Sequence, residues 1–150
     1  MSNNSGREGH FTLVPSIYLL LRRGDEVLLL RRANTGYMDG MYNLLAGHLE
    51  AGEPATEGMA REASEEAGIT IDPSKMRQVF TGLRYNRERL DLVFEVREWQ
   101  GEIVNREPER CDDLSWFPIA KLPENTVPYV HYMLCAIAAG ATYGEYFEDV

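Results

Sequence analysis

Residues 47–69 read GHLEAGEPATEGMAREASEEAGI and predict an acidic helix that a glycine-containing loop precedes. Gly68 is the residue type that most often ends a helix. At about 100° per residue, this helix turns Glu62, Glu65 and Glu66 onto one face. Small apolar side chains fill the adjoining arc: Met59, Ala60, Ala63 and Ala67. We therefore expect the helix to pack through its alanines and to present three carboxylates beside the packed edge.

Two explanations fit three carboxylates this close together. Most glutamate-rich helices simply carry a solvated acidic face. Arg61 borders the cluster, with Glu65 as its i,i+4 partner, and one arginine cannot neutralise three glutamates. Clustered carboxylates with so little cationic compensation are the ligands that a hard divalent cation prefers. A metal site therefore competes with the solvated face as an explanation.

The remaining chain alternates predicted strands with helices. Residues 11–23 and 27–32 indicate a hairpin with its turn near Gly24. Further predicted elements are strands at 42–46, 76–85, 90–99 and 114–117, polar loops at 33–41 and 101–113, the acidic helix from Pro54 to Ala67, and a helix over 127–139 that Asn125 or Thr126 would cap and Gly140 would end. We predict no element from Tyr143 onward. The order favours one α/β domain over residues 11–150, after a loose tail over residues 1–10.

Bulk properties exclude several classes of function. The formal net charge of −9 disfavours broad binding to a nucleic-acid backbone. The two cysteines, Cys111 and Cys135, show no metal-binding spacing and are expected to be free thiols. No signal peptide and no apolar run long enough for a membrane span is evident. We expect a cytoplasmic protein with no membrane contact.

The spacing of residues 47–69 also carries a resemblance. Gly47 is followed after five residues by Glu53, and after seven more by Arg61-Glu62, an aliphatic slot, any residue, Glu65-Glu66, any residue, Gly68 and an aliphatic residue. This order resembles the signature of the Nudix hydrolases, with a MutT-type member as the nearest pattern. It departs from the common pattern where Leu45-Ala46-Gly47 replaces Pro-Gly-Gly and where the small Ala63 fills the aliphatic slot. The resemblance implies an α/β/α sandwich with a mixed sheet and a loop–helix–loop signature.

The resemblance assigns roles to the residues of the signature. Glu62 and Glu66 are the implied chief ligands of Mg²⁺, with Mn²⁺ as an alternative ion. Glu65 is implied either as a further ligand or as the base that acts on water. The backbone carbonyl of Ala46 is an implied ligand, and the carbonyl survives the change from glycine to alanine. The residues implied to brace the loop onto the helix are Gly47, Glu53, Arg61 and Gly68.

Residues outside the signature complete the expected site. The segment WQGEIVNREPERC resembles the loop of MutT-type members that supplies another carboxylate, and Glu107 matches by position. The alternative is that Glu107 is one surface acid among several. The residues expected to line the substrate pocket are Tyr37, Met41, Asn125 and Thr126.

The implied chemistry is metal-dependent cleavage of a phosphoanhydride in a nucleoside diphosphate linked to a group X. A nucleoside triphosphate, cut to a monophosphate and pyrophosphate, is the leading substrate. A dinucleoside polyphosphate or an ADP-sugar is the alternative. Tyr85 keeps the dinucleoside polyphosphate open as a substrate. The absence of a proline after the signature disfavours ADP-ribose. The net charge disfavours capped RNA, so no nucleic-acid polymer is expected as partner. A catalytically silent nucleotide-binding module is the alternative of another class, and a homodimer is left open.

Overall fold

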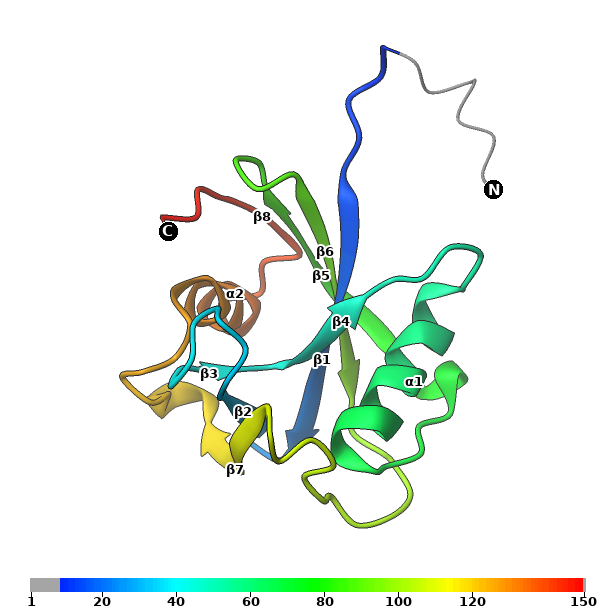
Figure 1. The fold of residues 1–150 in the computed structure, drawn as a ribbon, viewed down its shortest axis with the longest axis vertical. Helices are drawn as coiled ribbons and strands as arrows, with labels where there is room; N and C mark the ends of the chain where they lie inside the picture. Colours follow the sequence, from blue (N-terminus) through cyan, green and yellow to red (C-terminus); the bar gives the residue numbers. More distant parts are fainter. Residues whose placement is uncertain (1–8, 150) are drawn as a thin grey trace.

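A computed structural model describes residues 9–149, so most of the predicted tail over residues 1–10 lies outside the described residues. Within residues 9–149, two helices flank one mixed sheet of eight strands (Figure 1). The strands are β1 (Val14–Arg23), β2 (Glu26–Arg32), β3 (Tyr42–Asn43), β4 (Leu45–His48), β5 (Arg77–Arg84), β6 (Arg89–Val96), β7 (Cys111–Pro118) and β8 (Tyr143–Tyr146). The helices are α1 (Ala55–Ala67) and α2 (Pro128–Ala138), with short 3-10 turns at Pro73–Lys75 and Ile119–Lys121. The predicted α/β sandwich with a mixed sheet is confirmed.

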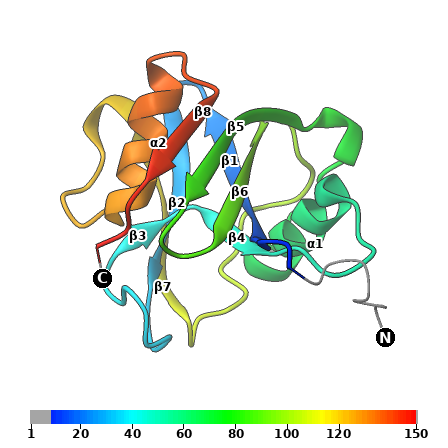
Figure 2. The same ribbon diagram turned by 90° about the horizontal axis from the view of Figure 1, so that it is seen from above.

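Strand β1 lies at the centre of the sheet and separates two cores. Its side chains alternate, so Ile17 and Leu19 face α1 whereas Tyr18 and Leu20 face α2. The two helices consequently cover opposite faces of the sheet, as Figures 1 and 2 show. Each core is stabilised mainly by the burial of apolar surface, which contributes about 25 cal/mol per Å².

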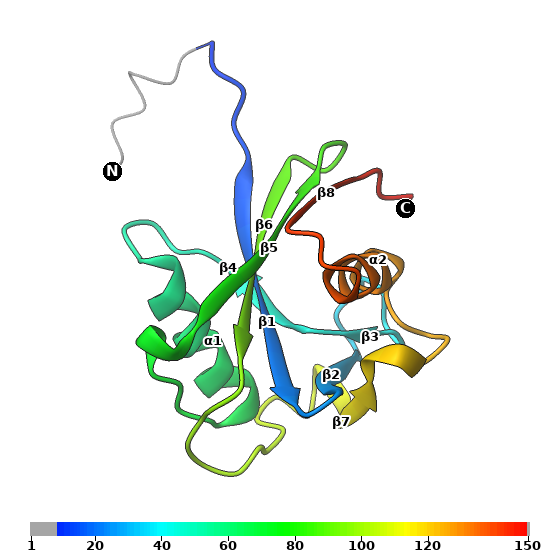
Figure 3. The same cartoon turned by 180° about the vertical axis from the view of Figure 1, so that it is seen from behind.

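The sheet divides along β1. Strand β1 pairs with β4 over residues 16–19 on one side and in parallel with β6 over residues 14–21 on the other, whereas β2 pairs with β1 only next to the hairpin turn. Strand β2 then continues with β3 and β7, away from β6, as seen from behind in Figure 3. The hairpin turn at Gly24, predicted from the sequence, is present with a positive φ of 58°.

The predicted strand over residues 42–46 is wrong in its extent. Tyr42 and Asn43 pair with β2 as β3, and the chain then crosses at Leu44 to pair with β1 as β4. Strand β4 continues through Gly47 to His48, because four residues of β1 are available on that edge and pair with it. His48 is the exposed last residue of β4.

The predicted caps of α2 are also wrong. Val127 is its N-cap residue and makes no side-chain capping bond, and Pro128 occupies the first turn. The Asn125 amide instead donates to the Gly40 carbonyl at 2.9 Å, and the Thr126 hydroxyl donates to the Pro123 carbonyl at 2.7 Å. These bonds hold the segment before α2 in place of a cap.

The acidic helix matches its prediction closely. Pro54 is the N-cap residue, and Gly68 ends the helix with φ 69° and donates its N–H to the Ser64 carbonyl. Met59, Ala63 and Ala67 are buried against the sheet. The acidic face consequently lies at the edge of this packed seam.

Two other segments differ from expectation. Strand β7 begins at Cys111, so the predicted polar loop ends earlier than residue 113. Residues 143–146, for which no element was predicted, form β8 in parallel with β5 at the edge of the sheet. Both cysteines are free thiols, and no helix within residues 9–149 is long and apolar enough to cross a bilayer.

Candidate active site

Arg61 connects the loop before α1 to the acidic face of the helix. Its Nε and Nη2 donate to the two Glu53 carboxylate oxygens at 2.9 and 3.1 Å, and its Nη1 donates to Glu62 Oε1 at 2.9 Å. Glu65 Oε2 lies 3.4 Å from the same Nη1. The Arg61 guanidinium therefore holds the pKa of Glu53 below its usual value. The acidic cluster has more cationic compensation than the sequence indicates, because Arg61 contacts several carboxylates at once.

Glu62 and Glu66 lie next to each other on α1, beside strand β4. Burial, followed by the charge of Glu62, raises the pKa of Glu66 to about 9, whereas a hydrogen bond from the Ala46 backbone opposes this shift. Without a cation, the neutral form of Glu66 is therefore favoured. Glu65 projects to the exposed side of the helix and contacts Arg61.

The loop after β6 brings Glu107 to the end of α1. The backbone N–H groups of Val104 and Arg106 donate to the carbonyls of Ala67 and Glu66, at 3.0 and 3.1 Å. These two bonds use carbonyls that the helix itself leaves unpaired at its end. Burial raises the pKa of Glu107 and Arg110 opposes this shift, while Glu62 is among the charges that raise it further.

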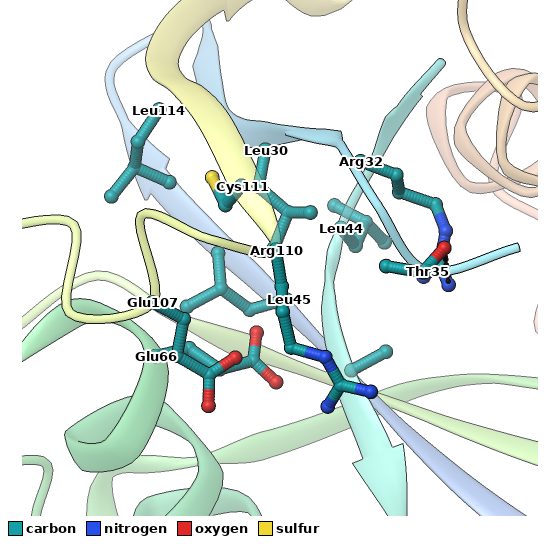
Figure 4. A pocket seen from close by; sticks show the side chains of 11 residues that line it. Leu30, Arg32, Thr35, Leu44, Leu45, Glu66, Glu107, Arg110, Cys111 and Leu114 are labelled. Carbon is teal, nitrogen blue, oxygen red and sulfur yellow. Dashed lines mark hydrogen bonds between the residues drawn. The ribbon is translucent and has the colours of Figure 1, made fainter. Parts of the chain in front are cut away.

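These elements enclose a cavity of about 230 Å³, here called the carboxylate cavity (Figure 4). The carboxylates of Glu66 and Glu107 project into it together with the Arg110 guanidinium, and Arg32 and Thr35 lie across from them (Figure 4). Its other lining residues are Leu30, Leu44, Leu45, Ala46, Cys111 and Leu114. A cavity with an apolar floor and with acidic and basic groups at its rim suits a charged ligand whose anionic groups are bound through a metal ion.

A second cavity of about 330 Å³ lies on the α2 side of β4 and is here called the arginine cavity. It shares Ala46 and Arg32 with the carboxylate cavity. Its lining residues are Ser16, Tyr18, Arg32, Tyr37, Asn43, Ala46, Gly47, His48, Arg84, Arg87, Arg89 and Glu148. The two cavities therefore meet at the residue before the signature glycine.

The carboxylates near α1 suit a divalent cation whose shell is completed by other ligands. Within residues 9–149, no three His, Cys, Asp or Glu side chains are grouped closely enough to enclose an ion by themselves. Mg²⁺ commonly takes only one or two protein carboxylates and completes its shell with waters and substrate phosphates. Glu66, which accepts a hydrogen bond from the Ala46 backbone, and its neighbour Glu62 fit such a partly open shell.

The other residues expected at the site lie in different places. Tyr37 lines the arginine cavity, whereas Met41 packs against the core beneath α2. Asn125 and Thr126 line neither cavity and stabilise the entry to α2. Sequence reasoning missed the basic side chains, which come from β2, the β5–β6 hairpin and the loop before β7: Arg32, Arg84, Arg87, Arg89 and Arg110. Only Arg110, three residues after Glu107, lies near a sequence feature that could have indicated it.

Comparison with known proteins identifies the family of the chain. The sequence model of the family described as NUDIX domain matches residues 12–135. The chain is 39% identical over 111 residues to the NAD-capped RNA hydrolase NudC of Stutzerimonas stutzeri (strain A1501), covering 74% of this chain and 38% of that protein. It is 33% identical over 114 residues to the protein of the same name from Chromobacterium violaceum, covering 76% and 41%. The chain thus spans about two fifths of the length of the curated relatives it matches.

Solved structures share the fold. The MutT NUDIX hydrolase from Burkholderia pseudomallei superposes with a TM-score of 0.73 at 23% identity, over 82% of this chain and 96% of that one. The MutT protein from Methanosarcina mazei Go1 gives a TM-score of 0.70 at 24% identity, over 85% and 94%. The family match over most of the chain, together with the signature on α1 and its loop, shows that the chain belongs to the Nudix family.

Proposed function

We propose that this chain is a metal-dependent pyrophosphohydrolase that cleaves a phosphoanhydride bond in a nucleoside diphosphate linked to a group X. One observation carries the proposal. Glu66 from α1, Ala46 from β4 and Glu107 from a distant loop line one cavity together with Arg110, and Glu62 lies next to Glu66 on the same helix. Cleavage of an anhydride requires neutralised phosphate charge and an activated water, and a metal ion held by these residues would supply both.

We assign metal binding to Glu62, Glu66 and the Ala46 carbonyl. A bound Mg²⁺ or Mn²⁺ would neutralise the diphosphate and lower the pKa of a coordinated water. Arg110 projects into the same cavity and suits a phosphate oxygen of the substrate. These residues therefore position the diphosphate across the mouth of the carboxylate cavity.

We assign to Glu107 the role of the base that accepts a proton from the attacking water. It lines the cavity, and burial raises its pKa toward the range in which a carboxylate accepts a proton effectively. Glu65 lies outside both cavities and holds Arg61, which favours a positioning role for Glu65 over that of base. Arg61 and Glu53 then fix the start of α1 relative to Glu62.

A nucleoside triphosphate, cut to a monophosphate and pyrophosphate, is our leading substrate. Arg32 and Arg110 at the carboxylate cavity provide donors for a polyphosphate chain. A dinucleotide is the second candidate, because the curated relatives are named NAD-capped RNA hydrolases. The net charge of −9 argues against long contacts with an RNA backbone but does not oppose a small dinucleotide.

A panel of nucleotides tests the proposal. Nucleoside triphosphates, dinucleoside polyphosphates, NAD and ADP-sugars would be incubated with Mg²⁺ or Mn²⁺, and the products separated by chromatography. We expect pyrophosphate release from at least one triphosphate. Tight nucleotide binding without any product would contradict the proposal and favour a catalytically silent module.

Single glutamine variants then test the residues. Glu62→Gln and Glu66→Gln are each expected to lower kcat by about 100-fold or more, and Glu107→Gln to lower it by about 100-fold, the usual range for a lost proton-transfer group. Glu57→Gln is the matched control, because Glu57 is exposed in the first turn of the same helix. Near-native turnover in the Glu62 or Glu66 variant would exclude the metal-ligand assignment.

A further inference from the structure

The arginine cavity has a charge opposite to that of the whole chain. Four guanidinium groups line it, from Arg32, Arg84, Arg87 and Arg89; Glu148 is the carboxylate in its lining, and the buried Asp91 pairs with Arg84. The chain itself carries a formal net charge of −9. Such a concentration of one sign in a concave site attracts ligands of the other sign.

Glu148 shows that this wall already binds a carboxylate. Only 4% of Glu148 is exposed, and its oxygens lie 3.3 Å from Arg84 Nη1 and 3.2 Å from Arg87 Nε and accept a hydrogen bond from the Tyr37 hydroxyl. The Glu148 backbone is held by Asn86, whose side chain donates to the carbonyl at 2.8 Å and accepts from the N–H at 2.9 Å. The cavity wall is therefore a built site for an anionic oxygen pair.

The remaining donors of the cavity have no anion within the described part of the chain. Arg89 makes no ion pair with any residue from 9 to 149. Arg32 donates only to neutral oxygens, the Tyr37 carbonyl at 2.7 Å and the Thr35 hydroxyl at 3.0 Å. Arginine is the preferred residue for binding phosphate, because its fork of donors matches two oxygens at once.

Asn43 is a second, independent sign of a ligand. Its residue is 7% exposed, and its Oδ1 is buried with no hydrogen-bond partner among residues 9–149. A buried polar atom without a partner costs about 1–3 kcal/mol, so native structures rarely leave one. Asn43 lines the arginine cavity, and because its Oδ1 is an acceptor, its partner would be a hydroxyl or N–H donor of the ligand rather than a phosphate oxygen.

We propose that the arginine cavity binds the anionic end of group X, a phosphate that lies beyond the bond being cleaved. The assignment rests on the proposed function, which places the diphosphate at the carboxylate cavity. Because the two cavities meet at Ala46 and Arg32, a substrate that extends past the diphosphate enters the arginine cavity. The geometry therefore selects substrates with an anionic X, such as a nucleoside triphosphate, over those with a neutral sugar.

Free phosphate shares this chemistry, so the first experiment measures it without catalysis. Binding of inorganic phosphate would be followed by calorimetry in EDTA, which removes any metal that would itself bind phosphate. We expect Arg89→Gln to weaken phosphate binding about 10-fold or more, the usual effect of one lost charge-assisted hydrogen bond. Arg77→Gln is the matched control, because it removes the same charge from an exposed position on β5. Equal binding by the wild type and the Arg89 variant would overturn the site.

The second experiment asks whether the substrate uses the cavity. For the best triphosphate, Arg89→Gln is expected to raise KM about 10-fold with a smaller effect on kcat, while Arg77→Gln changes neither. Arg89→Lys keeps the charge and is expected to recover part of the affinity, which separates a binding role from a folding defect. An unchanged KM beside weakened phosphate binding would assign the cavity to free phosphate and overturn the substrate role. If Arg89→Gln loses phosphate binding while the wild-type protein cleaves no nucleotide, the proposed function would be refuted, whereas the assignment of the anion site would stand.

Discussion

Gly47 lies directly against the carboxylate of Glu62. A Cβ built on Gly47 would come within 2.3 Å of both Cδ and Oε1 of Glu62, far closer than real contacts allow. The signature glycine is therefore required by a close approach between β4 and α1. We predict that Gly47→Ala displaces Glu62 and lowers kcat by about 100-fold, or ~2.7 kcal/mol of transition-state stabilisation.

Two measurements check the Gly47 prediction. Steady-state kinetics gives the loss of kcat, and Mn²⁺ titration is expected to show weaker metal binding, whereas circular dichroism should show an intact fold. Wild-type turnover by the alanine variant would contradict the explanation, since the Glu62 carboxylate would then tolerate a shift.

Arg61 forms a two-point contact with Glu53 that a lysine cannot reproduce. Its Nε and Nη2 each bind one Glu53 oxygen while Nη1 reaches Glu62. Arg61→Lys keeps the charge but loses the planar fork, so we expect kcat to fall about 10-fold through a misplaced Glu62. Arg97→Lys, at an exposed arginine that contacts Glu95, is the control and should retain full activity. Equal rates in both variants would show that charge alone suffices at position 61.

Asp91 is buried at the centre of the α2 face. It is 0% exposed, binds Arg84 through both oxygens at 2.8 and 2.9 Å, and accepts from the Tyr129 hydroxyl at 2.6 Å. Asp91→Asn leaves the Arg84 guanidinium without its main counter-charge. We expect the free energy of unfolding to fall by about 3–5 kcal/mol, measured by urea denaturation. A loss below about 1 kcal/mol would show that Glu148 alone compensates Arg84.

Tyr42 and Asp113 connect β3 to β7 and predict a response to acid. The Tyr42 hydroxyl donates to Asp113 and lowers the pKa of this carboxyl below its ordinary value of 3.8. A group with a lowered folded pKa adds stability above its unfolded pKa, and this stability disappears as the pH falls through the folded value. We expect Tyr42→Phe to move the midpoint of acid unfolding to higher pH, followed by fluorescence. Tyr143→Phe, at an exposed tyrosine, is the control and should leave the midpoint unchanged. A midpoint that stays the same in Tyr42→Phe would remove Asp113 from the acid transition.

Local patterns in the sequence predict some elements of this fold and not others. The acidic helix follows from its period, and its end follows from Gly68, whose φ of 69° few other residues adopt. The crossing at Leu44 cannot be read locally, because it depends on which edges of β1 and β2 are unpaired. The same holds for β8, which forms because β5 offers a free edge.

The candidate site divides in the same way. Glu62 and Glu66 could be predicted because helical spacing alone puts them on one face. The arginine cavity could not be predicted, since Arg32, Arg84 and Glu148 are far apart in the chain and meet only through the sheet. The spacing of the signature is informative about the metal ligands and carries no information on what binds beside them.

The parallel pairing of β1 with β6 has a consequence for folding. Val14 pairs with Arg89 and Leu21 with Val96, so the ladder joins segments about half the chain apart. Such non-local pairing forms slowly, because the intervening loop loses its conformational entropy before the contacts compensate. Until this ladder closes, the carboxylates of α1 and the arginines at the β5–β6 turn belong to separate parts of the chain. During refolding, the ability to bind phosphate in the arginine cavity should therefore appear in the slow phase that completes the central sheet.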